Sequence, residues 1–193
     1  MELGVPQGSI LGPILFLIYV NDITNCDTTA KFVKFADDTT VITSAPSLKE
    51  ATHKMNITMD KVNTWFQSNK LNLNPSKTRY MIFNGKNTKE TKLVQIDGQY
   101  IDRVWGQGDE NAFKLVGIMI DEQPKWDHHI AYIAKKIGYA NYSLNKARKR
   151  LTIKSKKLLC SGLIHSHLVY GAPVWGSAPK CRIDKLLKQQ KRQ

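Results

Sequence analysis

Two adjacent aspartates, Asp37 and Asp38, stand between two short runs that favour β-strands, residues 30–35 and 39–44. Both runs are rich in β-branched and aromatic residues, and such a pair of runs predicts a β-hairpin. The hairpin would place both carboxylates at its tip, where they repel each other and gain little from packing. A bound divalent cation would remove that repulsion, since Mg²⁺ prefers carboxylate oxygens, waters and phosphates as ligands. For the dipeptide alone a solvated turn is the simpler interpretation, so the rest of the chain has to decide.

The net charge of the 193 residues is +13, and it is unevenly distributed. Residues 1–127 contain 14 Lys and Arg against 15 Asp and Glu, whereas residues 128–193 contain 15 basic residues and one acid, Asp184. A segment with this density of positive charge suits a polyanion, and nucleic acid is the first candidate. An anionic membrane surface is a less suitable partner, because nothing in the sequence indicates an anchor.

Residues 128–151 have the periodicity of an amphipathic helix, with an apolar stripe from Ile130 to Leu151. Its opposite face is basic and is predicted to bind nucleic acid through Lys135, Lys136, Lys146, Arg148, Lys149 and Arg150. Aromatic residues are interleaved with the basic ones and are expected to offer stacking surfaces to bases, namely Tyr139, Tyr142 and Trp175. The alternative is a basic face that only keeps the helix soluble.

The N-terminal loop over residues 4–9, Gly-Val-Pro-Gln-Gly-Ser, leads into an apolar segment. Ser9 is a candidate N-cap for a helix that runs to about Asn25. Because this helix is apolar nearly all round, we expect it to be buried on several sides. The loop has two interpretations: ordinary helix-entry chemistry, or a backbone near Gly8 that approaches a ligand closely, with Gln7 as a hydrogen-bonding residue.

The middle of the chain contains a well-marked amphipathic helix. Ser47 with Glu50 is a capping-box pattern, and the apolar stripe that follows as far as Phe66 is assigned to the core. Asn74-Pro75-Ser76 ends this pattern, Lys77 comes next, and a strand is predicted over residues 78–83.

Two further β-elements and two further helices are predicted. Asp97-Gly98 predicts a hairpin within residues 94–102, and residues 113–120 are predicted to form a buried strand. Helices are expected over about residues 152–170 and from Ile183 onward.

Three widely spaced cysteines, Cys26, Cys160 and Cys181, indicate neither a disulfide framework nor a zinc site. An intracellular location, nuclear or cytoplasmic, is therefore expected. The longest apolar run, residues 10–20, is too short to span a bilayer and lacks the charged flank of a signal peptide. Four histidines are expected to be surface or packing residues rather than metal ligands: His128, His129, His165 and His167.

Taken in order, several segments resemble the conserved blocks of reverse transcriptases of the non-LTR (LINE-type) retrotransposon branch. The blocks are Gly4-Val5-Pro6-Gln7-Gly8-Ser9 with Leu11-Gly12-Pro13, Phe35-Ala36-Asp37-Asp38, Leu71-Asn72-Leu73-Asn74-Pro75-Ser76-Lys77-Thr78, Phe113-Lys114-Leu115-Val116-Gly117 with Trp126-Asp127-His128-His129-Ile130, and His167-Leu168-Val169-Tyr170-Gly171 with Trp175-Gly176. The resemblance covers essentially the whole chain. A group II intron or retron polymerase, which shares the palm blocks, is the alternative within this enzyme class, and the last block argues against it.

The resemblance implies RNA-templated DNA synthesis in which two Mg²⁺ ions stabilise the attacking and leaving oxygens. Asp37 matches the family's metal-binding carboxylate, and Asp38 matches its less direct companion. Lys77 matches a lysine proposed to protonate or neutralise the departing pyrophosphate. The implied partners are an RNA template, a DNA primer and deoxynucleoside triphosphates.

The resemblance also implies a substrate-binding set. Gln7 and Gly8 match positions that line the nucleotide and template pocket. Phe35 and Ala36 precede the aspartates in their motif, and Phe35 stands where many relatives carry tyrosine.

The expected fold class is α+β: a partial palm over residues 1–127, with an antiparallel hairpin and packed helices, then a basic helical thumb over residues 128–193. In the family, the other metal-binding aspartate and the fingers precede the block at Gly4, which here follows only three residues. We therefore expect a fragment that is inactive by itself unless another chain supplies the missing segment. The alternative function is a non-catalytic nucleic-acid-binding remnant.

Overall fold

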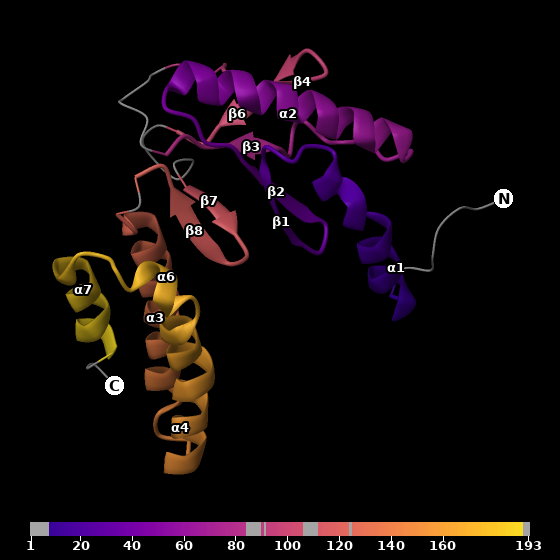
Figure 1. The fold of residues 1–193 in the computed structure, drawn as a ribbon. Coiled ribbons are helices and arrows are strands. Elements are labelled where there is room, and N and C mark those ends of the chain that lie inside the picture. The colour runs from indigo at the N-terminus through magenta and orange to yellow at the C-terminus, as the bar shows by residue number, and fades with distance from the viewer. Residues whose placement is uncertain (1–7, 84–89, 91, 106–111, 124, 191–193) are drawn as a thin grey trace. The chain divides into compact units, whose positions relative to one another are not determined.

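The computed structural model in Figure 1 describes residues 8–83, 90, 92–105, 112–123 and 125–190. The chain divides into two compact units. Unit 1 comprises Met1–Tyr80 and Gly85–Arg103, and unit 2 comprises Met81–Asn84 and Val104–Gln193. Helices and short strands occur in both units, which agrees with the expected α+β class.

The predicted hairpin around the two aspartates is confirmed. Strands β1 (Lys31–Phe35) and β2 (Asp38–Ile42) are antiparallel, and Phe35 lies opposite Asp38 in the last pair. Ala36 and Asp37 form the turn, and Ala36 has a φ of 52°, the positive angle that favoured two-residue hairpin turns require at this position. The register therefore fixes both aspartates at the tip.

The first helix is shorter and far more exposed than predicted. Helix α1 spans Leu11–Tyr19, and a 3₁₀ turn, η1, follows at Asn21–Asn25. The Ser9 hydroxyl accepts a hydrogen bond from the Gly12 amide at 3.1 Å, but the N-cap position is occupied by Ile10, one residue later than predicted. No residue of α1 is buried, so the expected burial on several sides is wrong: the described residues of unit 1 leave its apolar side chains uncovered.

Helix α2 (Leu48–Ser68) confirms the central amphipathic helix and its cap. The Ser47 side chain accepts a hydrogen bond from the Glu50 amide at 3.2 Å. Of the predicted stripe, Met59 and Val62 are buried, and four members are half-buried: Leu48, Ala51, Met55 and Phe66.

Asp27 fastens the segment after η1 to α2. Its carboxylate accepts hydrogen bonds from the Thr29 amide at 2.9 Å, the Thr29 hydroxyl at 2.8 Å and the Thr58 hydroxyl at 2.8 Å, and lies 3.4 Å from the Lys61 ammonium. Burial disfavours the charged form, but these donors outweigh it and hold the pKa of Asp27 well below its usual range. Asp27 therefore stays ionised inside unit 1.

The remaining strands of unit 1 are short. Strand β3 (Arg79–Tyr80) pairs in parallel with β6 (Asp102–Arg103), so the strand predicted over residues 78–83 is reduced to two residues. The predicted hairpin at Asp97-Gly98 is confirmed between β4 (Gln95–Ile96) and β5 (Gln99–Tyr100). Both turn residues have positive φ, 50° and 72°, as a type I′ turn requires.

In unit 2, residues 113–120 form a hairpin instead of the single buried strand that was predicted. Strand β7 (Ala112–Leu115) pairs with β8 (Ile118–Asp121) in antiparallel register. Val116 and Gly117 make the turn, with φ of 46° and 84°. The prediction was wrong because a β-branched residue is rarely found at positive φ, and so Val116 masked the turn in the sequence.

The helices of unit 2 largely follow the prediction. Helix α3 spans Asp127–Ala147. The second predicted helix is continuous but mixed, with α4 (Ile153–Cys160), a π-helical segment η3 (Ser161–His165) and α5 (Ser166–Val169). A short helix α6 (Ala172–Trp175), which was not predicted, precedes α7 (Lys180–Gln190). The core between them consists of Ile130, Ile133, Ile137, Ala140, Ile164, Trp175, Ala178 and Leu186.

His129 is a buried polar residue of this core, with 2% of its surface exposed. Its Nδ1 accepts a hydrogen bond from the Met119 amide at 3.2 Å, which joins α3 to β8. Burial lowers the pKa of the imidazole. The prediction that His129 is a packing residue is confirmed, since its ring lies 5.7 Å from that of Trp175 and 6.4 Å from that of Tyr132.

Lowering the pH should destabilise unit 2 through His129. The unfolded chain binds a proton at this residue near pH 6.5, whereas the folded chain does so only at lower pH. The contribution of neutral His129 to the free energy of unfolding is therefore fully present above pH 6.5. It decreases below pH 6.5, by at most about 1.4 kcal/mol per pH unit. Denaturant unfolding at pH 7.5, 6.5 and 5.5 measures this loss, and His129→Gln should flatten the dependence while the exposed control His165→Gln should not. An unchanged pH dependence in His129→Gln would contradict this role.

The exposed helix α1 should cause self-association. Ile14 is 50% exposed and Ile18 is 68% exposed, on a helix whose other residues are also uncovered. Monomers rarely expose contiguous apolar patches above a few hundred Å². We expect concentration-dependent oligomers in sedimentation velocity, and Ile14→Glu with Ile18→Glu should shift the population toward monomer. Ile153→Glu on α4, where the residue is 74% exposed, is the matched control and should have little effect. A monodisperse wild-type monomer would show that α1 does not mediate self-association.

Candidate functional site

The Asp37-Asp38 pair lies fully on the surface of unit 1. Asp37 is in the turn, Asp38 is the first residue of β2, and both side chains are exposed. The tip thus presents two neighbouring carboxylates to solvent, and oxygen donors of this kind suit a hard cation such as Mg²⁺. Within the described residues, no third Asp, Glu, His or Cys joins them in a group that could hold a metal.

Phe35 and Ala36 lie beside the aspartates on the same tip. Phe35 is 61% exposed, and Ala36 is exposed as well. Since Phe35 pairs with Asp38 across the ladder, an uncovered aromatic ring stands next to the carboxylates.

Lys34 anchors this hairpin from within β1. Its ammonium donates to the carbonyl oxygen of Val20 at 3.2 Å, to that of Asn21 at 3.0 Å and to Asn21 Oδ1 at 3.4 Å. Sequence reasoning missed this lysine, because no local pattern indicates which distant carbonyls a strand lysine will reach.

Lys77 lies in an exposed turn after α2. The Asn74 side chain shapes this turn by accepting hydrogen bonds from the Ser76 amide at 3.0 Å and the Lys77 amide at 3.3 Å. Among the ion pairs formed by described residues, none joins Lys77 to Asp37 or Asp38. The structure therefore exposes this side chain without bringing it into contact with the carboxylates.

The glycine of the N-terminal loop, Gly8, has a φ of 89° and open space where a side chain would stand. A residue with a Cβ would be strained at this angle, so the position favours glycine. Gln7, the other predicted pocket residue, lies outside the described residues.

The predicted basic face lies in unit 2, and all six of its side chains are exposed. Lys135 and Lys136 belong to the middle of α3, Lys146 belongs to its last turn, and the other three lie in the turn that leads to α4. In Figure 1, α3 lies beside the continuous helical run of α4, η3 and α5, below the β7–β8 hairpin. The basic residues are Lys135, Lys136, Lys146, Arg148, Lys149 and Arg150.

Two of the three predicted stacking residues are available on this surface. Tyr139 is 62% exposed and Tyr142 is 67% exposed. Trp175 is 5% exposed, so the expectation that it offers a stacking surface is wrong. Its Nε1 donates to the Tyr170 carbonyl oxygen at 2.9 Å and its ring packs on His129, which commits the indole to the core.

Tyr170 is a second residue whose role was not predicted. Its hydroxyl donates to the Val116 carbonyl oxygen at 2.5 Å, and its ring covers Gly117 so closely that a Cβ there would lie 3.2 Å from it. Tyr170 therefore holds the tip of the β7–β8 hairpin against the helices of unit 2.

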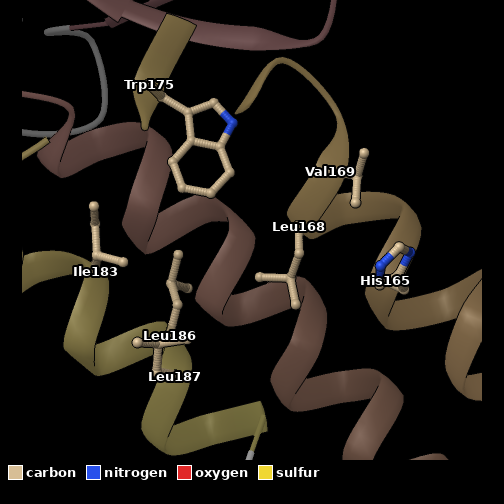
Figure 2. Close-up of a pocket in the computed structure, with 7 residues that line it drawn as sticks. All are labelled: His165, Leu168, Val169, Trp175, Ile183, Leu186 and Leu187. Atoms are coloured by element: carbon tan, nitrogen blue, oxygen red, sulfur yellow. The ribbon is translucent and has the colours of Figure 1, made fainter. Parts of the chain in front are cut away.

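Unit 2 also contains an apolar cavity of about 240 Å³ (Figure 2), between the α5–α6 segment and α7. Its lining is apolar apart from one histidine, and the residues come from η3, α5, α6 and α7: His165, Leu168, Val169, Trp175, Ile183, Leu186 and Leu187. Of the predicted stacking residues Trp175 lines it, and none of the predicted metal-binding or basic residues does. None of the helices in the described part of the chain is long and apolar enough to cross a membrane.

Comparison with known proteins identifies the family. The sequence model described as reverse transcriptase (RNA-dependent DNA polymerase) matches residues 1–140. The RNA-directed DNA polymerase from mobile element jockey of Drosophila melanogaster is 27% identical over 95% of this chain and 20% of its own length. The probable RNA-directed DNA polymerase from transposon X-element of the same species is 24% identical over 95% of this chain and 20% of its own length. No solved structure is matched significantly.

A third relative, the retrovirus-related Pol polyprotein from type-1 retrotransposable element R1 2 of Nasonia vitripennis, is 24% identical over 89% of this chain and 43% of its own length. The chain spans about a fifth of the length of the jockey and X-element relatives. These matches confirm the resemblance to the non-LTR branch. The chain belongs to the reverse transcriptase (RNA-dependent DNA polymerase) family.

Proposed function

We propose that this chain is part of an RNA-directed DNA polymerase of a non-LTR retrotransposon, comprising palm elements and a basic thumb. The observation that carries the proposal is the Asp37-Asp38 pair, exposed at the tip of a two-stranded hairpin in a chain whose residues 1–140 match the family. The proposed substrates are deoxynucleoside triphosphates, and the proposed partner is an RNA template paired with a DNA primer.

Asp37 and Asp38 would hold Mg²⁺, because their carboxylates are exposed and adjacent and neither forms an ion pair within the described residues. A bound ion would stabilise the negative charge on the reacting phosphate oxygens. The ladder pair between Phe35 and Asp38 keeps the backbone of the second aspartate fixed relative to the first strand. The exposed ring of Phe35 would pack against the sugar or base of the nucleotide.

Lys77 and the loop at Gly8 would contact the nucleotide triphosphate and the template. The exposed ammonium of Lys77 could neutralise the departing pyrophosphate, for which a point charge is sufficient. Gly8 leaves open space where a side chain would stand, so the backbone there can approach a nucleotide closely, and Gln7 would supply a hydrogen-bonding side chain.

The basic face of unit 2 would bind the template–primer duplex as a thumb. Phosphate contacts require only exposed Lys and Arg side chains, which this face has, and Tyr139 and Tyr142 add two exposed rings. Arg182 is less suited to this role, since it pairs with Asp127 at 2.7 Å. The exposed basic face also supports the second candidate function, a nucleic-acid-binding remnant without catalysis.

The polypeptide of residues 1–193 should not extend a primer by itself. Two-metal chemistry holds two ions about 3.5–4 Å apart. Two neighbouring carboxylates on one turn are too few ligands for both ions, and no third ligating residue joins them in the described part of the chain. A primer-extension assay with RNA template, deoxynucleotides and Mg²⁺ should give no product above background. Robust extension that Asp37→Asn abolishes would refute this expectation.

Nucleic-acid binding should persist and depend on salt. If about five side chains meet phosphates, the log–log slope of affinity against salt should be about −4.5 on B-DNA, with a different coefficient for an RNA–DNA hybrid. Neutralising Lys146, Arg148, Lys149 and Arg150 to Gln should reduce the slope by about 3 to 4. Fluorescence titration of a labelled hybrid at several salt concentrations measures both slopes.

The matched control neutralises four exposed lysines that lie within residues 1–127: Lys31, Lys49, Lys70 and Lys92. This variant has the same net charge as the first one, so a general charge effect would lower both affinities equally. Equal losses in the two variants, or an affinity that does not change with salt, would contradict the thumb assignment.

A further inference from the structure

We propose that Lys34 is a positioning residue, which fixes the orientation of the Asp37-Asp38 hairpin relative to the C-terminal end of α1. The inference rests on the proposed function insofar as the hairpin carries the metal-binding aspartates. It adds a residue whose role is to hold the site rather than to contact the substrate.

The hairpin needs an anchor because its sheet is small. Strands β1 and β2 pair only with each other in the described part of the chain. Isolated two-stranded hairpins are marginally stable in water, and packing against another element normally supports them. Val33, Phe35 and Ile42 lie on one face of the hairpin and are 48%, 61% and 46% exposed, so support comes from the other face, where Lys34 lies beside the half-buried pair of Phe32 and Val41.

The hydrogen bonds of Lys34 supply the connection. Among the side-chain hydrogen bonds of the described residues, those that join the hairpin to the rest of unit 1 come from the Lys34 ammonium. They reach the Val20 carbonyl at 3.2 Å, the Asn21 carbonyl at 3.0 Å and the Asn21 amide oxygen at 3.4 Å. An ammonium has three donors, and here it meets three acceptors.

A cation is suited to this place. Val20 is the residue that ends α1, and the carbonyl end of a helix carries partial negative charge, which favours a neighbouring positive group. Lys34 pairs with Thr39 in the ladder, directly before the closing pair of Phe35 and Asp38. The anchor therefore acts close to the tip, where a small change of hairpin angle moves the carboxylates most.

The anchor also links two parts of the proposed site. Helix α1 begins three residues after Gly8, and Lys34 holds the other end of that helix to the hairpin. Without Lys34 the ladder can remain intact while the hairpin swings relative to α1. The aspartates would then lose their fixed position relative to the proposed nucleotide loop.

Distances between two spin labels test this directly in the full chain. One label is placed at Ile10→Cys, before α1, and the other at Thr39→Cys near the tip, with Cys26, Cys160 and Cys181 replaced by serine. Pulsed electron paramagnetic resonance should give one narrow distance distribution for the labelled protein that retains Lys34. Lys34→Met should broaden it about twofold, because the hairpin samples more orientations.

Two further variants make the readout specific. Lys34→Arg, which keeps the charge and the donors, should restore a narrow distribution. Lys31→Met changes an exposed lysine of the same strand whose ammonium makes no hydrogen bond within the described residues, and it should leave the distribution narrow. If Lys34→Met does not fold, Lys34→Gln tests the same loss of the hydrogen bonds to Val20 and Asn21 with a shorter, polar side chain.

A distribution in Lys34→Met or Lys34→Gln that is as narrow as that of the parent, with the same mean, would overturn the proposal. Equal broadening in Lys31→Met would do the same. The distances are measured without metal or nucleotide, so this failure would leave the proposed metal site intact. Conversely, loss of the metal site would not change the distances.

Discussion

The turn between β1 and β2 imposes the constraint on which the proposed site depends. Two residues close the ladder, Ala36 has a φ of 52°, and Phe35 must then lie opposite Asp38. The two aspartates are consequently neighbours on one exposed tip, where their charges repel. A bound divalent cation would be coordinated by these carboxylate oxygens and would relieve their repulsion. In our proposal, Lys34 then fixes the orientation of this turn relative to the C-terminal end of α1.

Unit 2 is organised by a different interaction, the hydrogen bond from the Met119 amide to His129. It fastens the β7–β8 hairpin to α3 at mid-strand, while Tyr170 fastens the same hairpin at its tip. With the apolar side of α3 committed to this core, its basic residues remain on the surface. The proposed chemistry and the proposed nucleic-acid binding therefore draw on separate compact units, each with its own core.

Elements with a local chemical signal were predictable from the sequence. The Ser47 cap began α2 at the expected residue, Asp97-Gly98 made the expected turn, and the apolar periodicity of α3 identified its buried side. The basic residues were predictable as exposed, because charges without partners stay in water.

Features that depend on long-range packing were not predictable. Helix α1 is apolar enough to be a core helix, but its sequence does not say what covers it. Val116 gave no sign of a turn, because Tyr170, more than 50 residues away, holds that backbone in place. Trp175 has an aromatic ring that could stack on a base, but it packs in the core through a hydrogen bond to the Tyr170 carbonyl and a contact with the ring of His129. The reach of Lys34 likewise depends on where α1 ends.

The most direct test of the account is whether the Asp37-Asp38 tip binds a divalent cation. Mn²⁺ can replace Mg²⁺ at oxygen ligands and broadens the nuclear magnetic resonance signals of nearby amides. Titrating Mn²⁺ into the ¹⁵N-labelled chain should broaden the amides of residues 35–39 first, and excess Mg²⁺ should reverse the effect. Asp37→Asn and Asp38→Asn should each weaken this selective broadening. Broadening that avoids the tip, or that persists unchanged in both variants, would contradict the assignment of these aspartates as metal ligands.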